Sequence, residues 1–289
     1  MAEVRDWNIE SHSPRAKELM MRLPLGMPFV SMACAAFVIC AEPCAAATQS
    51  VGTPLPRFTL IESGVHRYLR YRVLGLQRAP VDIWTRAVAF ELHDGKRLMH
   101  IVMRWDKVAG PSEFIEQDSW FEPASFRPLT HVMTRKLRDA AAPEIGGYRF
   151  LPDKIVGMSE LPENLRKDFA IASSEAAYNF EYDMELLQAL PLAEGYSVSI
   201  PFYDPGNPQT ATARYTFKVA GSDRIRGPDG RSLECWLLTA DYNTGKIQSR
   251  FWFDKKTQIM IREEQPQSDG SILIKTLLEP EADDLRLTH

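Results

Sequence analysis

Most of the chain consists of short runs in which apolar and polar side chains alternate, which is the period of a β-strand. Residues 67–73, for example, interleave tyrosine, leucine and valine with arginines. Asp94 and Gly95 separate two β-rich runs, 83–93 and 97–105, and an Asp-Gly pair in that setting is a strong hairpin signal. The pattern therefore predicts a mainly β protein that is built from antiparallel hairpins.

Further strands are expected before and after a middle segment with a different period. They are predicted at residues 113–121, 129–137, 148–151, 154–158, 196–202, 215–220, 233–240, 246–253, 258–265 and 271–278. In the middle, Phe180, Met184 and Leu187 recur at helical spacing before Pro191. We expect a helical segment at about 161–191, with two to three turns of amphipathic helix that cover one face of the sheet.

The predicted fold is a curved antiparallel meander, half-barrel or barrel-like, with a small helical insertion. We expect a polar lead at 48–57, a single β-rich domain at 58–280 and an acidic tail at 281–289. The motif W-F-[DE]-x-x-[ST] occurs twice, at 120–125 and 252–257. It indicates either two related half-sheets or a chance match.

Residues 23–47 form the one long apolar stretch of the sequence and have the features of an export signal. Arg22 precedes the stretch, and Ala45 and Ala47 give the A-x-A pattern that signal peptidase accepts. Pro24 and Pro28 interrupt its apolar part, which ends at Glu42 and is therefore short for a membrane span. We predict cleavage near Ala47 and a periplasmic or secreted protein with no stable membrane span. A buried helix or a retained anchor is the alternative.

Residues 1–20 are unlike a signal n-region, because they carry four acidic side chains. We hypothesise that translation begins at Met20 or Met21, which makes 1–20 a mis-assigned extension. Cleavage would also remove Cys34, Cys40 and Cys44, and the mature chain could then form no internal disulfide.

Composition limits the class of function. Hydrophobic residues make up 45% and charged residues 25% of the 289 positions, which is typical of a folded domain. The net charge of −4 argues against nucleic acid as a partner, because such binders present a basic surface to the phosphates. We predict no nucleic-acid partner.

The last strands predict a sheet that is apolar on both faces. A three-residue loop at 243–245 would make Trp236 face Trp252 across two strands. The face with these tryptophans is the candidate ligand-binding surface, which comprises Trp236, Leu238, Arg250, Trp252, Ile259 and Ile261. Either protein covers this face or an apolar ligand occupies it. The candidate covering helix contributes Phe180, Met184 and Leu187.

The sequence carries no established catalytic or metal-binding motif. H-E-x-x-H, G-x-S-x-G, C-x-x-C and a glycine-rich phosphate loop do not occur. On the predicted hairpin His93 and His100 lie roughly 13 Å apart along one face, too far to share a metal. Cys235, on an apolar strand, fits a core thiol better than a nucleophile. We predict no metal and no cofactor.

The C-terminal third resembles a family of exported bacterial β-proteins. The residues that carry the resemblance are 251–257, followed by 261–263 and then Asp269 and Gly270. They are similar to an uncharacterised all-β family that is known only as a domain of unknown function. More distantly, they resemble the periplasmic lipoprotein carriers of the LolA/LolB type. The resemblance implies an incomplete barrel, covered by helix and able to hold acyl chains, and transfers no site residue.

The sequence therefore favours a non-catalytic binder or carrier of an apolar or lipid-like small molecule in the cell envelope. One alternative is an envelope scaffold that contacts other envelope proteins and fills its core with its own side chains. Another is a hydrolase that uses Cys235 or a histidine.

Overall fold

More than half of the described chain belongs to one strongly curved sheet, which is antiparallel except where β1 and β10 pair with β11. The structure is a computed structural model that describes residues 46–108, 113–137, 140–245 and 248–280. The strands are β1 (Ala47–Thr48), β2 (Gly64–Leu74), β3 (Gln77–His93), β4 (Lys96–Lys107), β5 (Phe114–Glu122), β6 (Arg127–Lys136), β7 (Glu144–Phe150), β8 (Lys154–Gly157), β9 (Ala170–Ala172), β10 (Tyr178–Asn179), β11 (Ser197–Tyr203), β12 (Ala213–Arg226), β13 (Ser232–Ala240), β14 (Ser249–Asp254), β15 (Met260–Pro266) and β16 (Ile272–Leu277).

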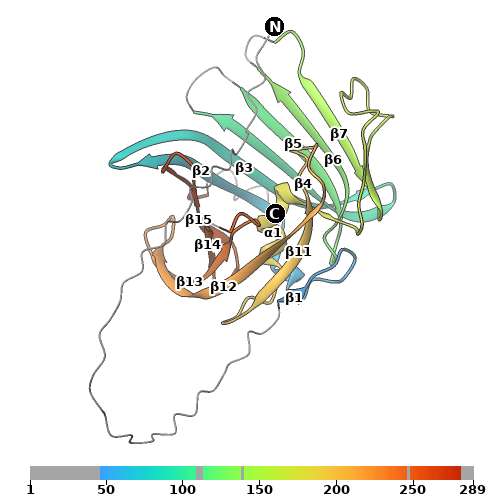
Figure 1. Cartoon of the computed structure of the whole chain (residues 1–289). Coiled ribbons are helices and arrows are strands. Elements are labelled where there is room, and N and C mark those ends of the chain that lie inside the picture. The colour runs from blue at the N-terminus through green and yellow to red at the C-terminus, as the bar shows by residue number, and fades with distance from the viewer. Residues whose placement is uncertain (1–45, 109–112, 138–139, 246–247, 281–289) are drawn as a thin grey trace, which may run out of the picture. The chain divides into compact units, whose positions relative to one another are not determined.

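The sheet consists of two meanders that join at one central pairing. Strands β2 to β9 pair in sequence order, as do β11 to β16, and β16 pairs with β2. β1 and β9 lie at the two ends of this path, so the sheet stays open. The described strands curve around the short helix α1 (Asp183–Gln188) (Figure 1). The predicted fold class, a curved antiparallel meander with a small helical insertion, is confirmed.

Helix α1 is much shorter than the sequence indicates. A 3-10 turn at Phe180–Tyr182 leads into α1, which has six residues, whereas two to three turns were expected within a helical segment at about 161–191. Residues 161–169 form turns instead, because the Asn164 side chain accepts a hydrogen bond from Gly147 N at 2.9 Å and holds the loop against β7. The helical prediction for this segment is therefore wrong.

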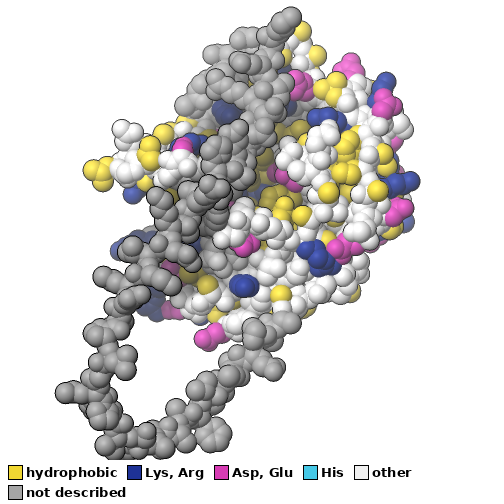
Figure 2. All heavy atoms as spheres, in the orientation of Figure 1, with side chains coloured by type: hydrophobic (Ala, Val, Ile, Leu, Met, Phe, Trp, Pro, Cys, Tyr) yellow, Lys and Arg dark blue, Asp and Glu magenta, His cyan; other side chains and the backbone are white. Residues whose placement is uncertain are grey.

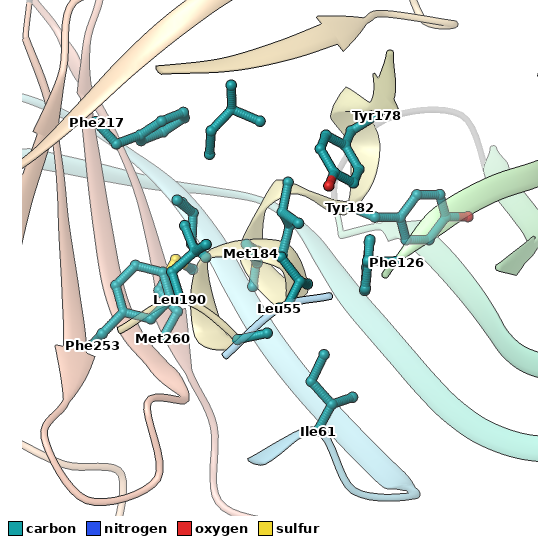
Figure 3. Close-up of a cluster of buried hydrophobic side chains, with 14 of the residues drawn as sticks. Leu55, Ile61, Phe126, Tyr178, Tyr182, Met184, Leu190, Phe217, Phe253 and Met260 are labelled. Carbon is teal, nitrogen blue, oxygen red and sulfur yellow. The ribbon is translucent and has the colours of Figure 1, made fainter. Parts of the chain in front are cut away.

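The core lies on the concave face of the sheet and is centred on α1. Leu186, Leu187 and Leu190 are fully buried there. Figure 3 shows Met184 and Leu190 beside Phe253 and Met260, with Tyr182 directed toward the other meander. The helix thus packs against both halves of the sheet.

The register of β13 against β14 differs by one residue from the sequence prediction. Trp236 pairs with Phe253, and Leu237 pairs with Trp252. The loop is longer than expected because Asp241 forms a turn of its own, in which Thr244 N donates to Asp241 O at 2.9 Å. Since side chains alternate, a slip of one residue places Trp236 and Trp252 on opposite faces of the sheet. The predicted shared tryptophan face is therefore wrong.

The repeated W-F-[DE]-x-x-[ST] motif has the same local structure in both copies. A β-bulge lies between Trp120 and Phe121, and another lies between Trp252 and Phe253. Six residues after each tryptophan, the backbone takes the left-handed region, with φ of 55° at Phe126 and 54° at Gln258. Few non-glycine residues adopt this conformation. The agreement favours two related half-sheets over a chance match.

Most of the predicted export signal lies outside the described residues, as do the acidic tail at 281–289 and the hypothesised start at Met20 or Met21. Ala47, at the predicted cleavage site, begins β1 and pairs with Val198 of β11. Among the described residues, no helix has the length and apolar character needed to cross a membrane.

Candidate functional site

A pocket of about 320 Å³ lies beside α1, at one end of the concave face. Its walls come from the segment that enters β2, from β3, from α1 and from the turn between β14 and β15. The apolar side chains that line it are Leu60, Ile61, Val65, Tyr68, Val88, Met184, Ile259, Met260 and Pro280. The volume is at the lower end of the range of small-molecule sites, which is about 300–1,000 Å³.

Strand register and one turn place these walls together. Gly64 of β2 pairs with Val88 of β3, so the residues two and four positions further along β2, His66 and Tyr68, lie on the same face. On the other wall, the Gln258 side chain donates to Gln188 O at 2.7 Å and to Leu190 O at 2.8 Å. The 3-10 turn at Phe58–Leu60 is tied to α1 through Gln188 Nε2, which donates to Leu60 O at 2.8 Å.

A buried ion pair lies next to the pocket. Arg86, on β3, is 1% exposed and binds Glu185 of α1 with both arms of its guanidinium, with Nε to Oε1 at 2.7 Å. It also donates to the Glu181 carbonyl oxygen at 3.2 Å. Burial would lower the pKa of Arg86, but the adjacent Glu185 carboxylate raises it overall. Arg86 therefore stays ionised, and the pair fixes α1 to the sheet.

Two titratable side chains on β2 line the pocket. Burial and the Arg86 charge lower the pKa of His66, against the opposite effect of Glu185, so the ring is neutral at pH 7. Burial also raises the pKa of Tyr68 well above its ordinary value, so its hydroxyl stays protonated. The pocket therefore offers neutral hydrogen-bonding groups within an apolar surface.

The pocket brings together only two of the nine side chains predicted for the ligand surface and its covering helix. Ile259 and Met184 line it. Phe180, Leu187, Trp236 and Leu238 belong to the core or pack against it. The remaining three, Arg250, Trp252 and Ile261, lie elsewhere: Trp252 and Ile261 form a separate cluster with Cys235, and Arg250 pairs with Glu264.

No pattern in the sequence indicated that the segment 60–66 is a pocket wall. Its residues are not periodic, and the long-range pairing of β16 with β2 brings them to the same pocket as the β14–β15 turn. A second hollow is lined by residues 159–169 alone, within one loop.

A buried Ser-His pair was also missed. Ser119 Oγ lies 2.9 Å from His131 Nδ1, across the β5–β6 register, and both residues are fully buried. Burial lowers the pKa of His131 to about 3, so the ring is neutral. Because neither side chain reaches solvent, this pair cannot meet a substrate in the present structure. We interpret it as core hydrogen bonding beside Tyr182.

The two hairpin histidines are closer to each other than backbone spacing implied. The rings of His93 and His100 both stack on Trp120, at centroid distances of 4.1 and 4.0 Å. His100 contacts Glu91 through Nδ1 at 2.9 Å and Asp118 through Nε2 at 3.0 Å. Burial lowers the pKa of His100, but these carboxylate contacts raise it overall. No group of three or more metal-ligating side chains is found in the described ranges.

Cys235 is a fully buried free thiol. Burial, followed by the charges of Asp254 and Asp223, raises its pKa to about 12. A thiol acts as a nucleophile in its ionised form, so this environment is the opposite of an activated one.

Surface charge in the described part of the molecule is mixed. On the face in Figure 2, acidic and basic side chains are interspersed. This differs from the one-sided basic surface of nucleic-acid binders.

The match to a known family begins within β2 and ends with β16. The family described as "Protein of unknown function (DUF3108)" matches residues 70–277. The chain belongs to this family. The DUF3108 match includes both meanders and α1, whereas the pocket residues at 60–68 and Pro280 lie outside it. This match confirms the sequence prediction that the chain belongs to an uncharacterised family of β-proteins.

Among solved structures, the chain is similar to a crystal structure of a beta-barrel-like protein of the domain of unknown function DUF1849 from Brucella abortus. The identity is 9% and the TM-score 0.46, over 80% of this chain and 98% of that chain. None of the curated proteins matches the chain.

Proposed function

We propose that this protein is a non-catalytic binder of an apolar, lipid-like small molecule, which it holds in the pocket beside α1. The observation that carries the proposal is the pocket itself. The pocket is mainly apolar and adjoins the core. One of its charged side chains, Glu185, is already paired with Arg86. Burial of an apolar ligand there would gain about 25 cal/mol for each Å² removed from water.

The first test is ligand binding by the full chain, purified without detergent. Native mass spectrometry and organic extraction should reveal a co-purifying lipid-like molecule. Dodecan-1-ol should displace an environment-sensitive fluorescent probe from the protein. No co-purifying molecule, together with no binding of either probe, would count decisively against the proposal.

A pocket-filling variant should abolish binding and leave the fold intact. The variant Ile259→Trp places a larger side chain at a half-buried position of the pocket wall. We expect probe affinity to fall at least about tenfold, because the indole occupies ligand volume. Ile225→Trp alters a half-buried isoleucine on the other face and should bind as the wild type does. Equal loss in both variants would contradict the assignment of the pocket.

We further propose that the binder acts in the cell envelope after export. The support is the sequence of residues 22–47. Edman sequencing or terminal peptide mapping of the protein from a periplasmic extract should give a chain that starts near Thr48. Recovery of a peptide that contains Trp7 would contradict both the cleavage and the hypothesised later start.

A scaffold role is the second candidate, and one observation favours it. The concave face around α1 is filled by the protein's own side chains (Figure 3). Leu186, Leu187 and Leu190 are fully buried there. A protein that binds no apolar probe, but is recovered cross-linked to another envelope protein, would support this candidate over the binder.

A further inference from the structure

Two polar side chains of the α1 pocket wall, Glu185 and Gln188, are occupied by other protein groups. Both carboxylate oxygens of Glu185 accept hydrogen bonds from Arg86. The Gln188 amide donates to Leu60 O at 2.8 Å and to Thr257 O at 3.3 Å. These side chains therefore have little capacity left for a ligand, although they lie in or beside the pocket wall.

The charges around the pocket also balance. Arg86 and Glu185 neutralise each other at its inner end, and the exposed lining residues Glu62 and Lys256 carry opposite signs. In the buried part of the pocket, an ionised head group would lose its hydration without meeting an unpaired counter-charge, because Arg86 is already paired with Glu185. Transfer of an unpaired charge from water into such a site is strongly unfavourable.

His66 is half-buried in the pocket wall, whereas the polar side chains of Glu62, Ser63, Lys256 and Thr257 are exposed there. It lies on β2 opposite Arg86, and its ring lines the pocket. Within the part of the chain that the structure describes, its ring nitrogens make no hydrogen bond or ion pair. A neutral imidazole has one donor and one acceptor nitrogen, which suits a hydroxyl group that both donates and accepts.

We propose that the pocket selects uncharged amphiphiles whose hydroxyl group hydrogen-bonds to His66, in preference to ionised amphiphiles of the same chain length. This inference rests on the proposed function and names the ligand class of the same site. Fatty alcohols and monoacylglycerols have the required chemistry. The alkyl chain would contact the Tyr68, Val88 and Met260 side of the pocket.

The test compares two probes that differ in the head group alone. Dodecan-1-ol and sodium dodecanoate are titrated into the full chain at pH 7.5, below their micellar concentrations, with calorimetry or probe displacement as the readout. We expect the alcohol to bind at least about tenfold more tightly, because the carboxylate must be desolvated without a counter-charge. Equal affinity, or tighter binding of dodecanoate, would overturn this inference and leave the proposed function standing.

A variant series isolates the contribution of His66. His66→Phe keeps a planar ring without hydrogen-bonding atoms, and should weaken alcohol binding about three- to tenfold, the effect of one hydrogen bond. His66→Asn restores a donor and an acceptor, and should recover part of the affinity. His93→Phe removes a half-exposed histidine outside the pocket and is the matched control.

The outcomes separate the two proposals. Unchanged alcohol affinity in His66→Phe would overturn the role of His66. If neither probe binds the wild type, the proposed function itself fails. If His66→Phe does not fold, as judged by thermal unfolding, the comparison of alcohol with carboxylate on the wild type decides the ligand class.

Discussion

At the scale of single residues, the interior of this protein is unusual in containing ionised groups that act between elements. Arg86 of β3 and Glu185 of α1 form a two-armed pair in which the arginine is 1% exposed. Lys275 of β16 binds Glu263 of β15 at 2.7 Å and lies 3.7 Å from the Met184 sulfur. These contacts specify where α1 sits against the sheet.

Replacing one partner of the buried pair should lower the free energy of unfolding far more than replacing both partners. Arg86→Met leaves the Glu185 carboxylate buried without a counter-charge, and should lower the free energy of unfolding by about 3–5 kcal/mol. The double variant Arg86→Met, Glu185→Leu should recover most of that loss. Urea unfolding of both variants measures it. Equal losses in the single and double variants would contradict a pair that acts as a unit.

At the scale of elements, α1 is a six-residue helix held by tertiary contacts, since a helix of this length is not stable alone. Acidic side chains lie in its first turn, where the helix dipole favours them. Its carboxyl end is fixed by Gln258, whose amide donates to two carbonyl groups there. The helical prediction is thus correct at 180–188 only, and the length of the helix is set by its tertiary partners.

The first residue of α1 predicts a pH dependence of stability. Burial, and then the charge of Glu263, raise the pKa of Asp183 from 3.8 to about 7, against the opposite effects of Lys275 and Arg86. The folded state therefore binds this proton more tightly than the unfolded state. The stability that this bound proton contributes to the folded state is complete below pH 4 and is lost as the pH rises to about 7.

The variant Asp183→Asn mimics the protonated carboxyl at every pH. It should be more stable than the wild type above pH 7, by at least about 1 kcal/mol, and the difference should vanish near pH 4. Urea unfolding at pH 4, 6 and 8 measures the difference. Glu181, whose pKa burial also raises to about 7, is present in both proteins; because the charge of Asp183 adds to that rise, the variant also lowers the pKa of Glu181, which adds to its gain in stability at high pH. A difference that does not vary with pH would contradict the assignment.

At the scale of the whole molecule, the two meanders form one sheet because β16 pairs with β2, far apart in sequence. The same pairing completes the pocket, since the segment before β2 is brought to α1 and the β14–β15 turn. The joining of the two meanders and the formation of the pocket therefore depend on the same long-range contacts. The repeated W-F motif places one bulge in each meander, at β5 and at β14.

A proline in the central strand should therefore disrupt the whole molecule. Ile274 of β16 pairs with both Glu264 and Tyr71, and Ile274→Pro should cost at least about 3 kcal/mol and abolish probe binding. Ala172→Pro in the edge strand β9 is the control. Its N–H points away from β8, because Ser173 N donates to Asp153 O and such bonds alternate along an antiparallel pair. Similar thermal unfolding of both variants would contradict the central role of β16.

The sequence by itself determined the mainly β class, the Asp94-Gly95 hairpin and the approximate strand positions, because these follow from local periodicity and turn chemistry. It also identified the repeated motif. Alternation does not define the register when both faces are apolar, and so the pairing of Trp236 was misjudged by one residue.

Only the tertiary structure decided the length of α1, the sandwich of Trp120 between two histidines, and the pocket. The pocket depends on residues from strands or loops distant in sequence, such as His66, Glu185 and Ile259, whose meeting relies on the β16–β2 pairing. Local patterns describe which face of a strand is apolar. They do not carry the curvature of the sheet, and the curvature is what brings those faces around one helix.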